Sequence, residues 1–138
     1  MAIKTIINDS NFHKLDESPS LIIGYIYEQA YVIDRQTEVA TNIGDFYGDP
    51  TCGIISLDNK WCLIAGASLA IWKPGGQVIK IDDQYLYWVV KITQVSPNEV
   101  QLLVDPSWSG QGSIWHFNID TLERFKIRDC NLNDEFYQ

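Results

Sequence analysis

Short runs of apolar and β-branched residues, each about as long as one strand and each ended by turn residues, recur along the whole sequence. Turns are marked by Gly, Pro, Asn and Asp, as at Pro74-Gly75-Gly76 and Pro97-Asn98. No long stretch has a helical period. This pattern predicts a mainly β chain, either an antiparallel β-sandwich or a small open barrel, with at most one or two short helices. The clearest expected strands are residues 21–27, 30–33, 52–57, 77–81, 85–95, 100–104 and 113–119.

Some segments fit more than one structure. Residues 21–30 could continue as a helix, and residues 121–127 fit a last strand or a short helix. Near the start, Asp9 and Ser10 can cap a brief helical turn that carries Phe12 and Leu15. Residues 38–43 form a weak strand candidate.

Residues 42–73 are the most informative stretch. A loop rich in Gly, Asp and Pro leads into the expected strand 52–57, and Asp58 and Asn59 tolerate the left-handed conformation of a hairpin turn. If these two residues centre the turn, Ile55 lies opposite Cys62. We expect residues 61–72 to form one central strand, bent at Gly66 and covered on both faces.

The length of 138 residues and the hydrophobic fraction of 46% predict a single globular domain, 1–138, with a substantial core. We find no internal repeat, linker or low-complexity segment in the sequence. The start lacks a long apolar segment, and no apolar run approaches the roughly 20 residues that span a bilayer. We therefore expect a cytoplasmic protein without a membrane segment.

The charge balance is acidic, with 10 Lys and Arg against 18 Asp and Glu and a net charge of −8. Nucleic acids and anionic membranes both attract cationic surfaces, so neither is an expected partner. Opposite charges steer protein association, and the balance therefore favours a basic protein partner.

The three cysteines, Cys52, Cys62 and Cys130, are odd in number and irregularly spaced. This pattern predicts reduced thiols and no required disulfide. Zinc sites commonly use close pairs such as C-x₂-C, which this chain lacks. We therefore expect no metal and no cofactor.

No catalytic motif stands out, so the chain is predicted to be non-enzymatic. His13 and His116 are far apart in sequence, and the glycines of residues 44–53 have no lysine among them to form a phosphate loop. The turn aspartates fit either local backbone hydrogen bonding or a negative patch for a basic partner. Aromatic residues in loops are good interface anchors or pack locally. The candidate partner-binding residues are Asp45, Tyr47, Asp49, Asp82, Asp83 and Trp108.

The Asp45-Phe46-Tyr47-Gly48-Asp49-Pro50 loop, together with the segments at 52–55 and 60–66, gives the chain a resemblance to bacterial immunity proteins of polymorphic-toxin and contact-dependent inhibition systems. The resemblance covers about a fifth of the chain and carries over no functional residues. It implies a cytoplasmic protein that blocks the active site or substrate surface of a basic toxin, for example a nuclease.

Two other functions remain open. A small β-barrel enzyme or ligand-binding protein would have an aromatic-lined pocket, with His116 beside an Asp or Glu in that pocket. A scaffold subunit would instead pair its strand edges with other chains.

Overall fold

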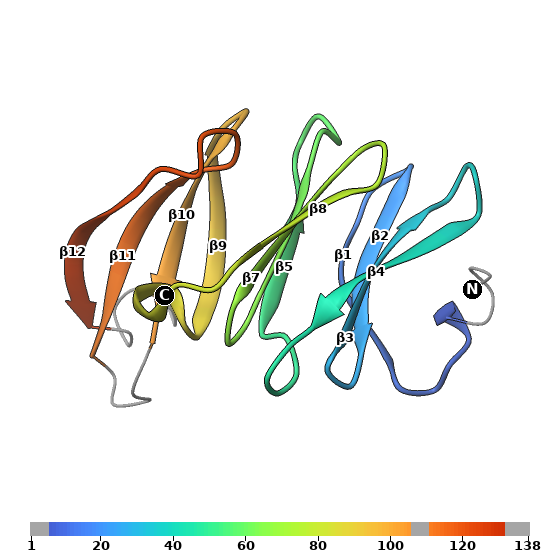
Figure 1. Ribbon diagram of the computed structural model, residues 1–138, viewed down its shortest axis with the longest axis horizontal. Coiled ribbons are helices and arrows are strands. Elements are labelled where there is room, and N and C mark those ends of the chain that lie inside the picture. The colour runs from blue at the N-terminus through green and yellow to red at the C-terminus, as the bar shows by residue number, and fades with distance from the viewer. Residues whose placement is uncertain (1–5, 106–110, 132–138) are drawn as a thin grey trace.

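The computed structural model describes residues 6–105 and 111–131, and these residues form three four-stranded antiparallel sheets (Figure 1). The first sheet contains β1 (Phe12–Glu17), β2 (Leu21–Ile26), β3 (Gln29–Asp34) and β4 (Val39–Asp45). The second contains β5 (Cys52–Ile55), β6 (Cys62–Ala65), β7 (Leu69–Lys73) and β8 (Gln77–Ile81). The third contains β9 (Val89–Ser96), β10 (Glu99–Val104), β11 (Gln111–Asn118) and β12 (Arg124–Asn131). The predicted mainly β, antiparallel fold is confirmed.

All three sheets have the same plan, in which each strand pairs with the next one along the chain. Their third strands begin at residues 29, 69 and 111, which are 40 and 42 residues apart. The chain is therefore a structural repeat, and the expectation of no internal repeat is wrong. The three units share the order of strands and turns but not their residues. Equivalent strand positions need only agree in being apolar or polar, so the repeat is not visible as sequence similarity.

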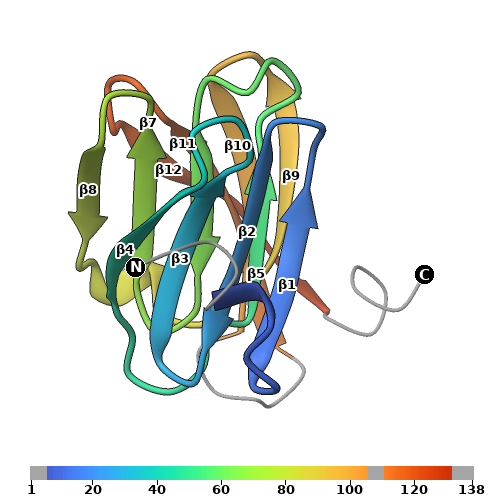
Figure 2. The same ribbon diagram turned by 90° about the vertical axis from the view of Figure 1, so that its right-hand side faces the viewer.

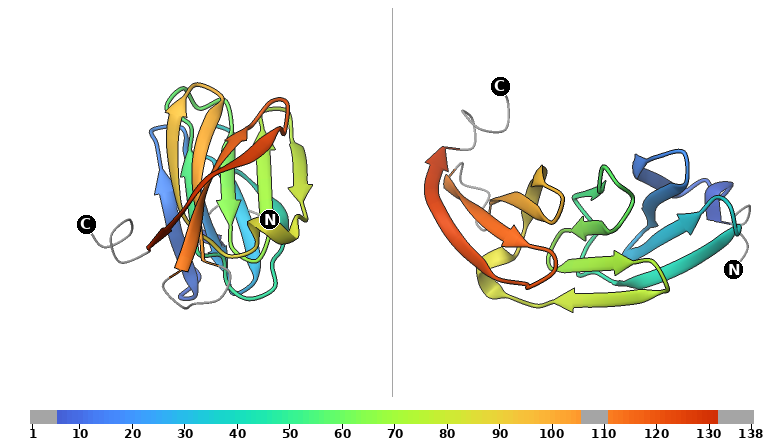
Figure 3. Two further views of the ribbon diagram at one scale, coloured as in Figure 1. Left: turned by 90° about the vertical axis from the view of Figure 1, so that its left-hand side faces the viewer. Right: turned by 90° about the horizontal axis from the view of Figure 1, so that it is seen from above.

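The sheets pack face to face in chain order, with the second sheet between the other two (Figures 1 and 2). The sheets approach one another most closely at their first strands, β1, β5 and β9. Seen from above, the outer strands β4, β8 and β12 follow the convex side of an arc (Figure 3). Neighbouring blades of a β-propeller have this arrangement, in which four-stranded sheets are set around an axis.

The middle sheet is buried on both faces because successive side chains of a strand point to opposite sides. Leu63 of β6 packs toward the third sheet, while its neighbour Ile64 packs toward the first sheet, and both are fully buried. This explains why the middle sheet has continuous apolar runs where a half-exposed strand would alternate.

The two end faces of the stack differ. The outer face of the first sheet is apolar, and Ile22, Tyr31 and Ile33 are buried there together with Ile6 from the preceding segment. The outer face of the third sheet is mixed, with buried Leu103 beside the exposed side chains of Lys91 and Gln101.

Hydrogen bonds also join the sheets. Asp16 of β1 accepts a hydrogen bond from the backbone N–H of Ile55 at 2.8 Å. On the other side of the middle sheet, Gln94 accepts one from the N–H of Leu57 at 2.9 Å. These side chains satisfy backbone donors at the free edge of the middle sheet, where no strand is available to pair with them.

The turn at Asp58 and Asn59 forms as predicted, with Asn59 at φ 58° and Ile55 opposite Cys62. The expected single strand 61–72 is wrong. The chain reverses at residues 66–68, so that β6 and β7 pair with each other and Ile64 lies opposite Ala70. The sequence of this turn has no Asn, Asp or Pro, which is why it resembled a bend within one strand.

The structure also decides the assignments of several other segments. Phe12 and Leu15 belong to strand β1 and not to a helical turn, because β1 gains a full antiparallel pairing with β2. The strand expected at 85–95 begins only at Val89, after a short 3₁₀ helix, η1 (Gln84–Leu86). Of the two alternatives at residues 121–127, the strand is correct, and so is the strand at residues 21–27.

Gly24 marks the closest approach of β1 to β2. A Cβ atom built on Gly24 would lie 2.3 Å from the backbone oxygen of His13 and 2.6 Å from the ring of Phe12. The β1 register shifts between Lys14 and Asp16, directly beside this position. The bulge therefore lies on β1, and Gly24 leaves the space that the bulged strand occupies.

Candidate binding groove

The segments that connect one sheet to the next lie together at one end of the stack. Each of them, residues 46–51 and 82–88, runs from the last strand of one sheet back to the first strand of the next. Because the sheets have the same plan, both segments lie at the same end. We call this the connector end of the stack.

An open groove of about 560 Å³ lies between these segments. It takes residues from both connecting segments, from the turn between β6 and β7, and from the end of β8. Its lining is formed by Tyr47, Ala67, Ser68, Lys80, Ile81, Asp82, Tyr87 and Trp88. The groove thus combines three aromatic side chains with one carboxylate and one ammonium group.

Tyr87 and Asp82 form the polar contact of the groove. The Tyr87 hydroxyl donates a 2.7 Å hydrogen bond to Oδ1 of Asp82. This bond favours the protonated phenol, and with partial desolvation and the charges of Asp82 and Asp83 it raises the pKa of Tyr87 above its usual value of 10.0. The two side chains therefore hold each other in place on the exposed surface.

Trp88 has a left-handed backbone with φ 64°, which is rare for a bulky residue. Two backbone hydrogen bonds fix this conformation: Trp88 N–H donates to Gly66 O at 2.8 Å, and Asp105 N–H donates to Trp88 O at 3.0 Å. The strain is thus held by the residue after β6 and the residue after β10, and the half-buried side chain of Trp88 lines the groove.

Lys80 passes close to the backbone of β4. A Cβ atom at Gly44 would lie 2.1 Å from Cε and 2.3 Å from Nζ of Lys80. Gly44 also has φ 137°, a conformation that side chains rarely allow. Gly44 therefore gives Lys80 room to lie beside the first sheet.

The structure brings several predicted partner-binding residues together. Tyr47 and Asp82 line the same groove, although they are 35 positions apart in the sequence, and Tyr47 is 83% exposed. Asp45 and Asp49 flank Tyr47 and are also exposed. Asp49 lies close enough to Tyr25 for its charge to contribute, after desolvation, to a raised pKa of that tyrosine.

Asp83 does not line the groove. Asp83 is paired with Arg124 at 2.8 Å, has a side chain only 18% exposed, and caps η1 by accepting a hydrogen bond from Tyr85 N–H. Its carboxylate thus joins the connecting segment to the third sheet. Trp108 lies outside the described residues.

His116 pairs with a carboxylate, but not in the groove. Its Nε2 lies 2.8 Å from Glu99 Oε2, and its ring stacks on Phe125 on the outer face of the third sheet. The groove is aromatic-lined but open, and the histidine–acid pair expected of a ligand-binding pocket lies on another surface.

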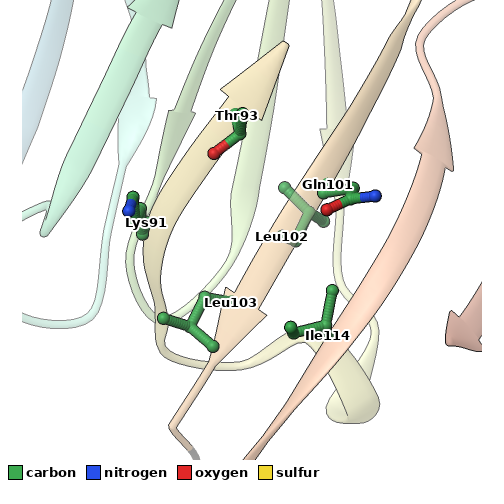
Figure 4. A pocket seen from close by; sticks show the side chains of 6 residues that line it. All are labelled: Lys91, Thr93, Gln101, Leu102, Leu103 and Ile114. Carbon is green, nitrogen blue, oxygen red and sulfur yellow. The ribbon is translucent and has the colours of Figure 1, made fainter. Parts of the chain in front are cut away.

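A second, smaller hollow of about 80 Å³ lies on that outer face (Figure 4). Figure 4 shows it between β9, β10 and β11, with Lys91 as its single ionisable lining residue. It is lined by Lys91, Thr93, Gln101, Leu102, Leu103 and Ile114. Its size and its lack of paired polar groups make it a weaker candidate than the groove.

The cysteines do not form a reactive site. None of them forms a disulfide, and burial raises the pKa of both Cys52 and Cys62 to about 12, so these two thiols stay protonated. Within residues 6–105 and 111–131, no three His, Cys, Asp or Glu side chains gather as metal ligands would.

Sequence reasoning missed Lys80, Tyr87 and Trp88 as groove residues. Trp88 and Tyr87 were expected in a strand, where aromatic residues are usually core. The regular recurrence of strands was the signal that could have identified these residues. With four strands in each sheet, it places the segments after the fourth and eighth strands together at one end of the stack.

The fold and the groove together define an all-β protein built of repeated four-stranded meanders, with an aromatic groove between two sheets. No protein-family model and no curated protein sequence matches the chain. Among solved structures, the chain is similar to Kuenenia stuttgartiensis hydrazine synthase, with a TM-score of 0.54 and 16% identity over 79% of this chain and 34% of that one. It is also similar to the tricorn protease, with a TM-score of 0.56 and 8% identity over 82% of this chain and 12% of that one. At these identities, the likeness concerns the fold alone. In the described part of the chain, no helix has the length and apolar character to cross a membrane.

Proposed function

We propose that this protein is a non-enzymatic binding module that engages a basic protein partner through the connector end. The supporting observation is that Tyr47 and Asp82, from two distant segments, share one open groove with Asp45 and Asp49 beside it. An exposed aromatic anchor surrounded by carboxylates suits a surface rich in Lys and Arg.

The resemblance to immunity proteins supplies the class of partner in this proposal. The protein would meet a basic toxin domain, such as a nuclease, in the cytoplasm. Binding would occlude the active site or the substrate surface, where cationic residues otherwise hold phosphate groups. Asp45, Asp49 and Asp82 would face those residues, while Tyr47 would anchor the contact.

Site-specific photo-crosslinking tests this proposal. A crosslinker at Tyr47 in the native host should capture one basic protein, because this side chain is at the centre of the proposed surface. The matched control is Leu57, which is 90% exposed but lies in the hairpin turn between β5 and β6, at the opposite end of the stack. Capture of the same protein from both positions, or from position 57 alone, would contradict the proposal.

A small-molecule binding function is the second candidate, and the volume and aromatic lining of the groove favour it. It differs in a measurable way. A small ligand from a protein-depleted extract of the host would bind to the purified protein and be lost in Tyr47→Ala. A protein-binding module would retain no such ligand.

A further inference from the structure

The groove has the chemical features of a site for one organic cation. Tyr47, Tyr87 and Trp88 are the three aromatic residues that line it, and Asp82 provides a carboxylate at the same place. Aromatic faces attract cations through the ring quadrupole, and Trp and Tyr are the strongest of the neutral side chains in this respect. A nearby carboxylate adds a counterion.

Trp88 supports a role for the groove that does not depend on its charge. A glycine would adopt φ 64° without strain, yet this position has the largest side chain. Strained residues held by their surroundings are concentrated at ligand sites. The backbone hydrogen bonds to Gly66 and Asp105 hold Trp88 in this conformation, and its side chain lines the groove together with Tyr87.

The charges around the groove indicate which sign of charge a ligand should carry. Glu28, Asp45, Asp49 and Asp82 are exposed at this end, and none forms an ion pair with another described residue. Glu28 belongs to this end because its Oε2 accepts a hydrogen bond from Gly48 N–H at 2.5 Å. Among the described residues, Lys80 is the single cation in the groove lining. In the lining itself the charges of Asp82 and Lys80 balance, and the carboxylates of Glu28, Asp45 and Asp49 beside it make the local potential negative, which attracts a cation.

We propose that the groove binds one basic side chain of the protein partner, a guanidinium or alkylammonium group, between Tyr47, Tyr87 and Trp88 with Asp82 as counterion. This inference rests on the proposed function and adds the chemistry that the partner must present. The partner inserts a single Arg or Lys into the groove, and the surrounding carboxylates meet the other charges of its surface.

Lys80 distinguishes this site from one for an anion. Lys80 belongs to β8 and Asp82 follows the end of that strand, and both side chains line the groove. A bound cation is repelled by Lys80, whereas a phosphate or carboxylate ligand would need it. Removing the Lys80 charge must therefore strengthen binding in one case and weaken it in the other.

The test uses short peptides as probes, so it does not require the partner. Acetyl-Gly-Xaa-Gly-amide, with Arg, Lys, norleucine or Glu as Xaa, is titrated into the protein while amide and indole chemical shifts are followed. We expect saturable binding of the Arg and Lys peptides with dissociation constants on the order of millimolar, and shifts of the Trp88 indole. The norleucine and Glu peptides should bind at least about fivefold more weakly. The comparison of Arg with Lys identifies which cation is preferred.

Three variants complete the test. Asp82→Asn and Tyr47→Ala should each weaken the Arg peptide by about threefold or more, while Lys80→Met should strengthen it by about twofold or more. Leu57→Ala, at the opposite end, is the control and should change nothing. Each variant is first checked for an unchanged melting temperature, and both Asp82 and Tyr47 are exposed, which favours retention of the fold.

Two outcomes would overturn the inference. One is preferential binding of the Glu peptide, lost in Lys80→Met. The other is equal binding of norleucine and Arg peptides. If position 47 still crosslinks a basic protein in either case, the proposed function survives and only the cation site fails; if crosslinking fails while the Arg peptide binds, the site stands without that partner.

Discussion

At Gly24, the pairing of β1 with β2 depends on the absence of a side chain. A Cβ atom there would meet the backbone of β1 at 2.3 Å, a distance that no rotamer change can relieve. We expect Gly24→Ala to lower the free energy of unfolding by about 1–3 kcal/mol, the usual cost of overpacking.

Gly53 provides the matched control, since its added Cβ would meet side-chain ends of Ile23 and Leu15 at 3.1 Å and the backbone oxygen of Leu63 at 3.2 Å, all farther than the 2.3 Å contact at Gly24. Gly53→Ala should lower the free energy of unfolding less than Gly24→Ala does, when both are measured by urea denaturation. Equal losses would mean that the close approach of β1 to Gly24 is not the cause.

The Tyr87–Asp82 hydrogen bond predicts a pH dependence at the alkaline side. Because the folded pKa of Tyr87 lies above the unfolded value of 10.0, its contribution to stability is full below about pH 10 and is lost as the pH rises through the folded value. Spectrophotometric titration of the tyrosines should show this group ionising late.

Tyr87→Phe removes the late-ionising group from the titration curve and so assigns it to Tyr87. Asp82→Ala should lower the pKa of Tyr87 toward 10.0, since the hydrogen bond to Asp82 is the largest cause of the raised value. If Asp82→Ala leaves the titration curve of every tyrosine unchanged, the two side chains do not interact in solution.

At the scale of elements, the Asp16 side chain makes a hydrogen bond from β1 to β5. Its Oδ2 accepts the N–H of Ile55 at 2.8 Å, and its Oδ1 accepts the N–H of Glu17 at 2.8 Å. Asp16→Ala would leave the Ile55 donor without its partner, so we expect a loss of about 1–3 kcal/mol in the free energy of unfolding.

Asp16→Asn keeps an acceptor oxygen and should therefore lower the melting temperature less than Asp16→Ala does. Hydrogen exchange of the Ile55 amide checks the mechanism directly. Unchanged exchange at Ile55 in Asp16→Ala would show that this contact does not protect the donor.

The middle sheet is buried on both faces. Ile64 of β6 is fully buried between the first and second sheets, so Ile64→Ala should cost about 2–5 kcal/mol through lost contacts and a cavity. Leu57→Ala removes an equally large side chain that is 90% exposed, and we expect little effect. Chemical denaturation of both variants makes the comparison, and a small loss at Ile64 would contradict the buried position of β6.

The elements that could be predicted from sequence are those with strong local signals. Turn residues fixed the hairpins at Asp58-Asn59, Pro74-Gly75-Gly76 and Pro97-Asn98, and the register of Ile55 with Cys62 followed from the turn. The reversal at residues 66–68 has no such residues, so one apolar run concealed two strands. In the groove, Tyr47 and Asp82 were predicted because they lie in loops, whereas Trp88 required the tertiary fold.

At the scale of the whole molecule, the net charge of −8 and the carboxylates of the connector end predict the kinetics of association. Asp45→Lys with Asp49→Lys should slow association with the basic partner and flatten its salt dependence, because charges at the rim act mainly on the on-rate. Tyr47→Ala should instead speed dissociation and cost about 2 kcal/mol or more if Tyr47 is a hot spot.

Stopped-flow kinetics at two salt concentrations measures both effects, and thermal melts confirm that the variants remain folded. An unchanged on-rate for the charge reversals at low salt would leave the acidic surface as a solubility device only. The proposed occlusion of a basic partner would then be rejected.

The order of the strands has a consequence for how the chain is made. Every strand pairing in the described structure joins consecutive strands, so each sheet can be completed before the next one is synthesised. Contacts that are local in sequence form quickly, which is unusual for an all-β protein. The first sheet, however, has Ile23 and Val32 on the face that the second sheet will cover. Once about 50 residues have left the ribosome, the nascent chain can therefore form the complete first sheet with its apolar face exposed to solvent. The time needed to synthesise residues 52–81 then determines how long this face can associate with other proteins.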